Sequence, residues 1–197
     1  MDVWTGGGYP DGMVSFANSI EDAPDMGPAI ATIARAFGQP SPEDLILDFR
    51  RGADELVKIR ESQEHWIASL LALVEVLPPE EIRELARKRP EVAAGWREAF
   101  VKSEEASRRF AKNVSEDRQT VLGVVAALPQ ILGSRASGPG FDRLNREVQD
   151  YDRAVTVMLE RVEDLLDILL AADACLDPDN LDAPVSWEAA RGQLGLG

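Results

Sequence analysis

This 197-residue sequence contains one histidine, His65, and one cysteine, Cys175, the two residue types that most often bind transition metals. A zinc site needs several His, Cys or carboxylate ligands, and a di-iron helical bundle needs two inward-facing histidines. Cys175 lies between Asp173 and Asp177 near the expected end of a helix, where negative charge disfavours a reactive thiolate. We therefore expect no catalytic residue, no metal and no cofactor, and predict that the chain is not an enzyme.

Carboxylates are abundant, but their arrangement does not indicate a specific site. The run from Asp177 through Asp179 to Glu188 has the approximate length of a calcium-binding loop, but Asp182 stands where such a loop needs glycine. Elsewhere acidic residues occur in adjacent pairs such as Asp54–Glu55. An acid–base pair needs two carboxyl groups in unequal environments, and nothing in the sequence separates one pair from the others. These pairs are typical of the solvated face of a helix.

The elements that would position any functional side chain are long amphipathic helices. Pro42, Pro79 and Pro90 are suited to the first turn of a helix, and the Pro78–Pro79 pair to the end of the helix before it. We predict long helices over 41–77, 90–128 and 141–175, with a short corner helix from Pro79. The third has the most regular apolar spacing, alternating steps of three and four residues. Its ladder is Phe141, Leu144, Val148, Tyr151, Val155, Met158, Val162, Leu165, Leu169, Ala172 and Leu176.

Similar helix lengths and connections of modest length are typical of antiparallel bundles. We predict an all-α fold in which residues 41–176 form an elongated antiparallel three-helix bundle with coiled-coil-like heptad packing. Residues 1–40 are expected to form an irregular N-terminal arm with a short helix near 28–37. Residues 177–197 are expected to form a C-terminal tail with a short helix. Gly52 is expected to leave space for the ring of Tyr151.

Polar residues interrupt the apolar seams of the first two long helices at Gln63, Ser107 and Asp117. In one interpretation Gln63 and Ser107 hydrogen-bond across the bundle and fix its register. In the other they line a small-molecule pocket. Asp117 either turns inward and pairs with Tyr151 or Arg118, or rotates outward so that Thr120 and Val121 replace it. The three seam residues are our predicted polar layer.

The N-terminal arm contains apolar side chains in a Gly-rich and Pro-rich context. Aromatic residues in such a segment are typical anchors for a partner protein. We leave open whether the arm docks on its own chain or on another. We predict that four apolar residues of the arm bind a partner: Trp4, Tyr9, Met13 and Phe16.

The formal net charge is −14, which disfavours nucleic-acid binding because that function needs a basic face. The segment 41–77 has eight acidic and four basic residues, and 141–175 has nine acidic and four basic residues.

The most apolar stretch is too short and too interrupted to cross a membrane. A single cysteine excludes an internal disulfide and indicates a reducing compartment, so we expect a cytoplasmic protein.

We predict a non-catalytic helical adaptor or scaffold subunit that mediates protein–protein assembly through its helix faces and its aromatic N-terminal arm. Self-association or membership of a larger complex is expected, because three long helices leave flanking apolar residues to cover. The alternative is an acidic inhibitor of a basic protein partner, of the antitoxin, immunity or counter-defence type.

Overall fold

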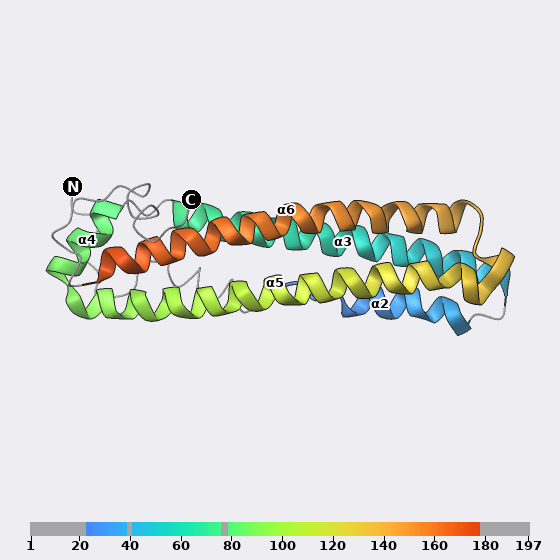
Figure 1. Ribbon diagram of the computed structural model, residues 1–197, viewed down its shortest axis with the longest axis horizontal. Helices are drawn as coiled ribbons and strands as arrows, with labels where there is room; N and C mark the ends of the chain where they lie inside the picture. Colours follow the sequence, from blue (N-terminus) through green and yellow to red (C-terminus); the bar gives the residue numbers. More distant parts are fainter. Residues whose placement is uncertain (1–22, 39–40, 76–78, 178–197) are drawn as a thin grey trace. The chain divides into compact units, whose positions relative to one another are not determined.

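The computed structural model describes residues 23–38, 41–75 and 79–177, and every regular element within these ranges is a helix. The predicted all-α class is confirmed. No helix within the same ranges combines the length and the apolar character needed to cross a membrane. The elements are α2 (Gly27–Ala34), the 3₁₀ helix η1 (Arg35–Gly38), α3 (Pro42–Glu75), α4 (Pro79–Lys88), α5 (Pro90–Leu132), the 3₁₀ helix η2 (Gly133–Arg135) and α6 (Pro139–Leu176) (Figure 1).

The ends of the helices follow local chemistry. Ser41 caps α3, since its Oγ accepts a hydrogen bond from the Asp44 backbone N–H at 3.1 Å and donates one to Asp44 Oδ2 at 2.6 Å. Helix α5 extends to Leu132, past the Pro129 at which we expected it to end. A proline within a helix lacks a backbone donor and its ring crowds the carbonyl four residues earlier, but here Leu128 and Leu132 are buried on either side of Pro129 and packing offsets this cost. The helix ends where Gly133 adopts the left-handed conformation, with φ of +56°.

The chain divides into two compact units, and the three long helices contribute segments to both. Among the described residues, unit 1 comprises 68–75, 79–108 and 162–177, and unit 2 comprises 23–38, 41–67 and 109–161. The α6 ladder supplies core residues to each unit. From Leu144 to Leu176 every member of this ladder is at most 2% exposed.

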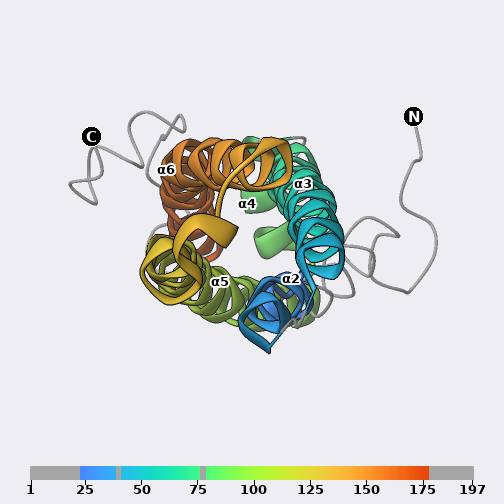
Figure 2. The same ribbon diagram turned by 90° about the vertical axis from the view of Figure 1, so that its right-hand side faces the viewer.

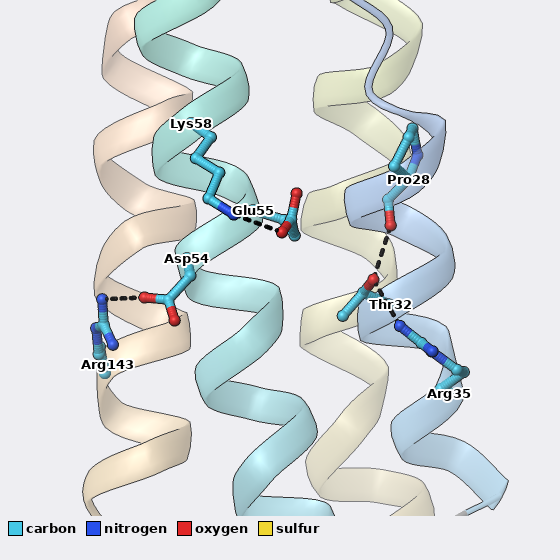
Figure 3. Close-up of polar contacts among 7 residues, drawn as sticks. All are labelled: Pro28, Thr32, Arg35, Asp54, Glu55, Lys58 and Arg143. Atoms are coloured by element: carbon cyan, nitrogen blue, oxygen red, sulfur yellow. Dashed lines mark hydrogen bonds and ion pairs between the residues drawn. The ribbon is translucent and has the colours of Figure 1, made fainter.

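Unit 2 contains four helical segments, from α2, α3, α5 and α6, and Figure 2 shows them around a common core. Contacts define their directions. Phe49 of α3 packs on Phe141 of α6, with ring centroids 5.4 Å apart, and Asp54 pairs with Arg143 at 2.6 Å (Figure 3). The residue numbers of these partners increase together, so the two segments run parallel. Trp66 of α3 packs on Phe110 of α5 at a centroid separation of 4.5 Å.

Helix α2 lies beside α3 in unit 2, so the segment before the first long helix docks on its own chain. A Cβ built on Gly52 would lie 2.8 Å from Ile33 Cγ1 and 3.5 Å from Leu144 Cδ1. The absent side chain of Gly52 therefore makes room for Ile33. This corrects our expectation that it accommodates the ring of Tyr151. Ile33 is fully buried, as are Met26 and Ala29.

Polar contacts also stabilise α2 internally. The Thr32 hydroxyl donates to the Pro28 carbonyl at 2.9 Å and accepts from Arg35 Nη2 at 2.9 Å (Figure 3). Thr32 is buried, so its hydroxyl needs these partners. A helix of eight residues is too short to be stable alone in water, and packing on α3 must supply the remainder of its stability.

Unit 1 contains α4 together with residues 68–75 of α3, 90–108 of α5 and 162–176 of α6. Its core contains Ile82 of α4, Trp96 and Phe100 of α5 and Leu169 of α6, each at most 3% exposed. Arg97 of α5 forms an ion pair with Asp173 of α6 at 2.9 Å. Both side chains are partly exposed, so the pair orients the helices more than it stabilises them.

Candidate functional site

Unit 2 contains a group of polar side chains, which we call the polar cluster: Gln63 of α3, Asp117 of α5, Tyr151 of α6 and Asp25, which precedes α2. The backbone carbonyl of Pro24 accepts a hydrogen bond from Gln63. Gln63 is 0% exposed and Tyr151 is 1% exposed. Asp117 is half-buried and Asp25 is exposed at the edge. Helices α3, α5 and α6 and the residues just before α2 thus each supply one polar side chain.

The register of α5 against α6 brings Asp117 and Tyr151 to the same level. Arg118 donates from Nε to Asp152 Oδ1 at 2.6 Å. The residues immediately before these two partners are Asp117 and Tyr151. This pairing also shows that Arg118 is engaged by α6, so it is not the partner that we considered for Asp117.

The register of α3 against α6 brings Gln63 to that level too. Arg60 and Glu147 form an ion pair at 3.8 Å. One helical turn further along each parallel segment lie Gln63 and Tyr151. The Gln63 amide donates from Nε2 to the Pro24 carbonyl at 3.4 Å, which ties the approach to α2 to the same level.

The electrostatics of the cluster disfavour negative charge on its members. Burial raises the pKa of the Asp117 carboxyl, and the carboxylates of Asp25 and Glu116 raise it further. Burial also raises the pKa of the Tyr151 phenol, Asp117 adds to this effect, and hydrogen bonding with the Gln63 side chain opposes it. Within the described residues no basic side chain forms an ion pair with Asp117. The cluster is therefore rich in oxygen acceptors and poor in positive charge.

Two buried oxygen atoms of the cluster lack hydrogen-bond partners within the described part of the chain. They are Gln63 Oε1 and the Tyr151 hydroxyl oxygen. Gln63 and Tyr151 lie close enough for the Gln63 side chain to act on the pKa of Tyr151 as a hydrogen-bond partner. The Tyr151 hydroxyl can donate to an amide oxygen, so a small side-chain rotation would let the two groups satisfy each other.

The structure brings two members of the predicted polar layer into one unit. Gln63 and Asp117 lie in unit 2, whereas Ser107 lies in unit 1. Ser107 is 0% exposed, and its hydroxyl has no hydrogen-bond partner within the described ranges. A layer containing all three residues stays a prediction. Asp117 is half-buried, Val121 is 1% exposed and Thr120 is exposed, so Val121 occupies the core as the outward rotation predicts, whereas Thr120 does not.

The lone cysteine and histidine occupy different environments. Cys175 is fully buried in unit 1, where burial raises the pKa of its thiol. Arg83 of α4 opposes this shift in part, and Glu80 adds to it. The net direction favours the neutral thiol, which is a poor nucleophile. His65 is exposed on α3.

The predicted partner-binding residues Trp4, Tyr9, Met13 and Phe16 lie outside the described residues, as does the predicted C-terminal short helix. Within the described ranges, no group of three or more His, Cys, Asp or Glu side chains is arranged to hold a metal ion. Sequence reasoning missed the contribution of Pro24 and Asp25. The pattern of apolar residues around Pro28 indicated a helix but carried no signal for the surface on which it docks.

No protein-family model matches this sequence, and no match is found among the curated proteins or the solved structures.

Proposed function

We propose that this protein is a non-catalytic helical adaptor or scaffold subunit that assembles with protein partners through its helix faces and its N-terminal arm. The observation that carries the proposal is a group of large apolar side chains exposed on the helices. Ile131 is 60% exposed, and the others are between 37% and 49% exposed: Ile46, Leu47, Val101 and Val157.

Three of these side chains lie towards one end of unit 2. The backbone of Gly140, in the first turn of α6, approaches Ile46, as a Cβ built on this glycine would lie 3.3 Å from Ile46 Cγ2. Leu47 follows Ile46 on α3, and Ile131 occupies the last turn of α5, which connects to α6 through η2. Scattered apolar residues are ordinary on a protein surface, whereas several at one end favour an interaction site.

The docking of α2 on its own chain supports a binding role for the segment that precedes it. Met26 is fully buried and Gln63 donates to Pro24, so the residues before α2 are attached to unit 2 at a defined position. An arm attached in this way would present Trp4, Tyr9, Met13 and Phe16 to a partner at a high effective concentration. We further propose that α3, α5 and α6 act as one elongated antiparallel three-helix bundle with heptad packing over 41–176.

The acidic-inhibitor alternative depends on free negative charge, and part of that charge is compensated. Four carboxylates of α6 form ion pairs with arginines, and these are Glu147, Asp150, Asp152 and Asp173. A net charge of −14 nevertheless leaves a basic partner as the second candidate. The two functions differ in their salt dependence, because exposed charge pairs are screened within about 8–10 Å at physiological ionic strength and more strongly above it.

Affinity capture from the native host, with quantitative mass spectrometry at 0.1 and 0.5 M NaCl, tests the proposal. The bait proteins are the full chain, a deletion of residues 1–22 and the double variant Leu47→Ser/Ile131→Ser. The control variant is Gly123→Ala, since a Cβ at Gly123 meets no atom within 4 Å. The adaptor proposal predicts a partner that is retained at 0.5 M NaCl and lost from the deletion or the double variant. A partner captured by every bait but lost at 0.5 M NaCl would favour the acidic inhibitor instead.

A further inference from the structure

The exposed side of α3, near the beginning of the helix, carries an apolar pair between opposite charges. Ile46 is 37% exposed and Leu47 is 44% exposed. Glu43 lies three residues before Ile46, Arg50 lies three residues after Leu47, and both charged side chains are exposed. Helical residues three or four positions apart share a face, so these four side chains form one surface, which we call the α3 stripe.

The two charged ends of the α3 stripe are available to a partner. Among the described residues neither Glu43 nor Arg50 forms an ion pair, whereas Arg51 pairs with Asp48 at 3.8 Å. The stripe also lies on a rigid support, because Leu45 on the inner side of the same helix is 1% exposed. A surface that is already ordered loses little conformational freedom when a partner binds it.

We propose that a second copy of this chain covers the α3 stripe, with the two α3 helices packed antiparallel about a twofold axis between Ile46 and Leu47. In a twofold contact each residue pair occurs twice, because the same surface of both copies is used. An antiparallel arrangement centred on this axis places Glu43 opposite Arg50 of the second copy. It also places Ile46 opposite Leu47 of the second copy, so the apolar pair is covered between two ion pairs.

The symmetric order of charges along the α3 stripe favours a second copy over other occupants. A chain with a net charge of −14 repels its own copies at long range, so self-association needs opposite charges close to the contact. The stripe supplies one charge of each sign at equal distances from its centre. Arg50 would repel a basic partner protein, and Glu43 would repel an acidic one. This inference rests on the proposed function, because it names one partner of the surface that contains Ile46 and Leu47.

The size of the α3 stripe indicates the strength of the dimer. From Glu43 to Arg50 the helix rises about 10 Å, at about 1.5 Å per residue. A contact of this length buries less than the roughly 1,200 Å² at the lower end of stable protein interfaces, in the range of transient ones. The dimer is therefore weak, and monomer and dimer exchange at micromolar concentrations.

Sedimentation velocity of the purified full chain, at concentrations from 1 to 300 µM in 0.15 M NaCl, tests for the dimer. The weight-average mass should rise from the monomer value towards the dimer value, and a monomer mass at every concentration would overturn the proposal. Glu43→Arg and Arg50→Glu should each weaken association at least about tenfold, because each variant places like charges opposite each other twice. Val157→Ser removes an apolar side chain of α6 that is 47% exposed, and should leave association unchanged.

Mixing the two charge variants tests the antiparallel arrangement itself. An equimolar mixture of Glu43→Arg and Arg50→Glu restores opposite charges at both contacts of a mixed dimer, so it should associate as strongly as the wild type. Circular dichroism confirms that each variant is folded. A mixture that associates no better than its components would refute the arrangement. A purified chain that stays monomeric but still captures a salt-resistant partner would refute the dimer and leave the adaptor function standing, whereas a dimer that captures no partner would do the reverse.

Discussion

Replacing Gly52 with alanine adds one methyl group to α3 where α2 packs on it, and so tests whether α2 docks there. Gly52 lies within α3, and the added Cβ would approach Ile33 Cγ1 to 2.8 Å, which is closer than carbon atoms pack without displacement. Ile33 cannot move aside easily, because it is β-branched and fully buried. Leu144 Cδ1 lies on the other side at 3.5 Å. The substitution therefore pushes α2 away from α3 or strains both helices.

The magnitude follows from two opposing effects. Alanine in place of glycine in a helix interior stabilises by about 1 kcal/mol. An extra methyl group in a packed core destabilises by about 1–3 kcal/mol. We therefore expect Gly52→Ala to leave stability unchanged or lower it by about 2 kcal/mol. Gly123→Ala is the matched control in α5, where a Cβ meets no atom within 4 Å and the full gain of about 1 kcal/mol is expected.

Chemical denaturation followed by circular dichroism measures both variants under the same conditions. The double variant Gly52→Ala/Ile33→Ala gives a further check, because removing Ile33 Cγ1 removes the conflict. We expect Gly52→Ala to become stabilising in the Ile33→Ala background, with a coupling energy of about 1–3 kcal/mol. Equal stabilisation by Gly52→Ala and Gly123→Ala in the wild-type background would refute the packing of Ile33 on Gly52.

Three further outcomes are expected. Ser41→Ala should cost about 1 kcal/mol by removing the cap at the Asp44 N–H, and Ser41→Asp should retain most of the stability; denaturation midpoints measure both. In metal-free buffer Asp117→Asn should raise Tm above neutral pH and lose this advantage at low pH, because a raised pKa means that ionisation of Asp117 destabilises the native state as pH increases. Equal gains in Tm across the pH range would contradict this. Cys175 should react with a thiol reagent at least about tenfold more slowly in the native protein than in urea, and equal rates would show that it is accessible.

The helices were predictable because their signals are local. Pro42 and Pro90 mark where helices begin, and the regular ladder from Phe141 to Leu176 fixed the buried face of α6. The end of α5 was misplaced, because Pro129 is normally a stop signal, whereas here the buried side chains of Leu128 and Leu132 extend the helix to Leu132. Such a boundary depends on whether tertiary packing outweighs the local cost of the proline, and the sequence pattern does not show that packing.

The polar cluster was less predictable because it depends on tertiary contacts. Gln63 and Asp117 stand out as breaks in apolar seams, and this signal is local. The effect of Asp25 on the pKa of Asp117 depends on where α2 docks, and that docking is recorded by the fit of Ile33 against Gly52 and by the hydrogen bond from Gln63 to Pro24. Amphipathic spacing in α2 shows that one face is buried but does not identify the surface that covers it.

The proposed function depends most directly on α2 lying against α3 of the same chain, because this contact attaches the N-terminal arm to unit 2. Hydrogen exchange of the α2 backbone amides, followed by mass spectrometry at two protein concentrations tenfold apart, measures it. We predict slow exchange around Ile33, equal at both concentrations, as expected for a helix docked within one chain. Exchange as fast as in an unstructured peptide, or protection that decreases on dilution, would contradict the account.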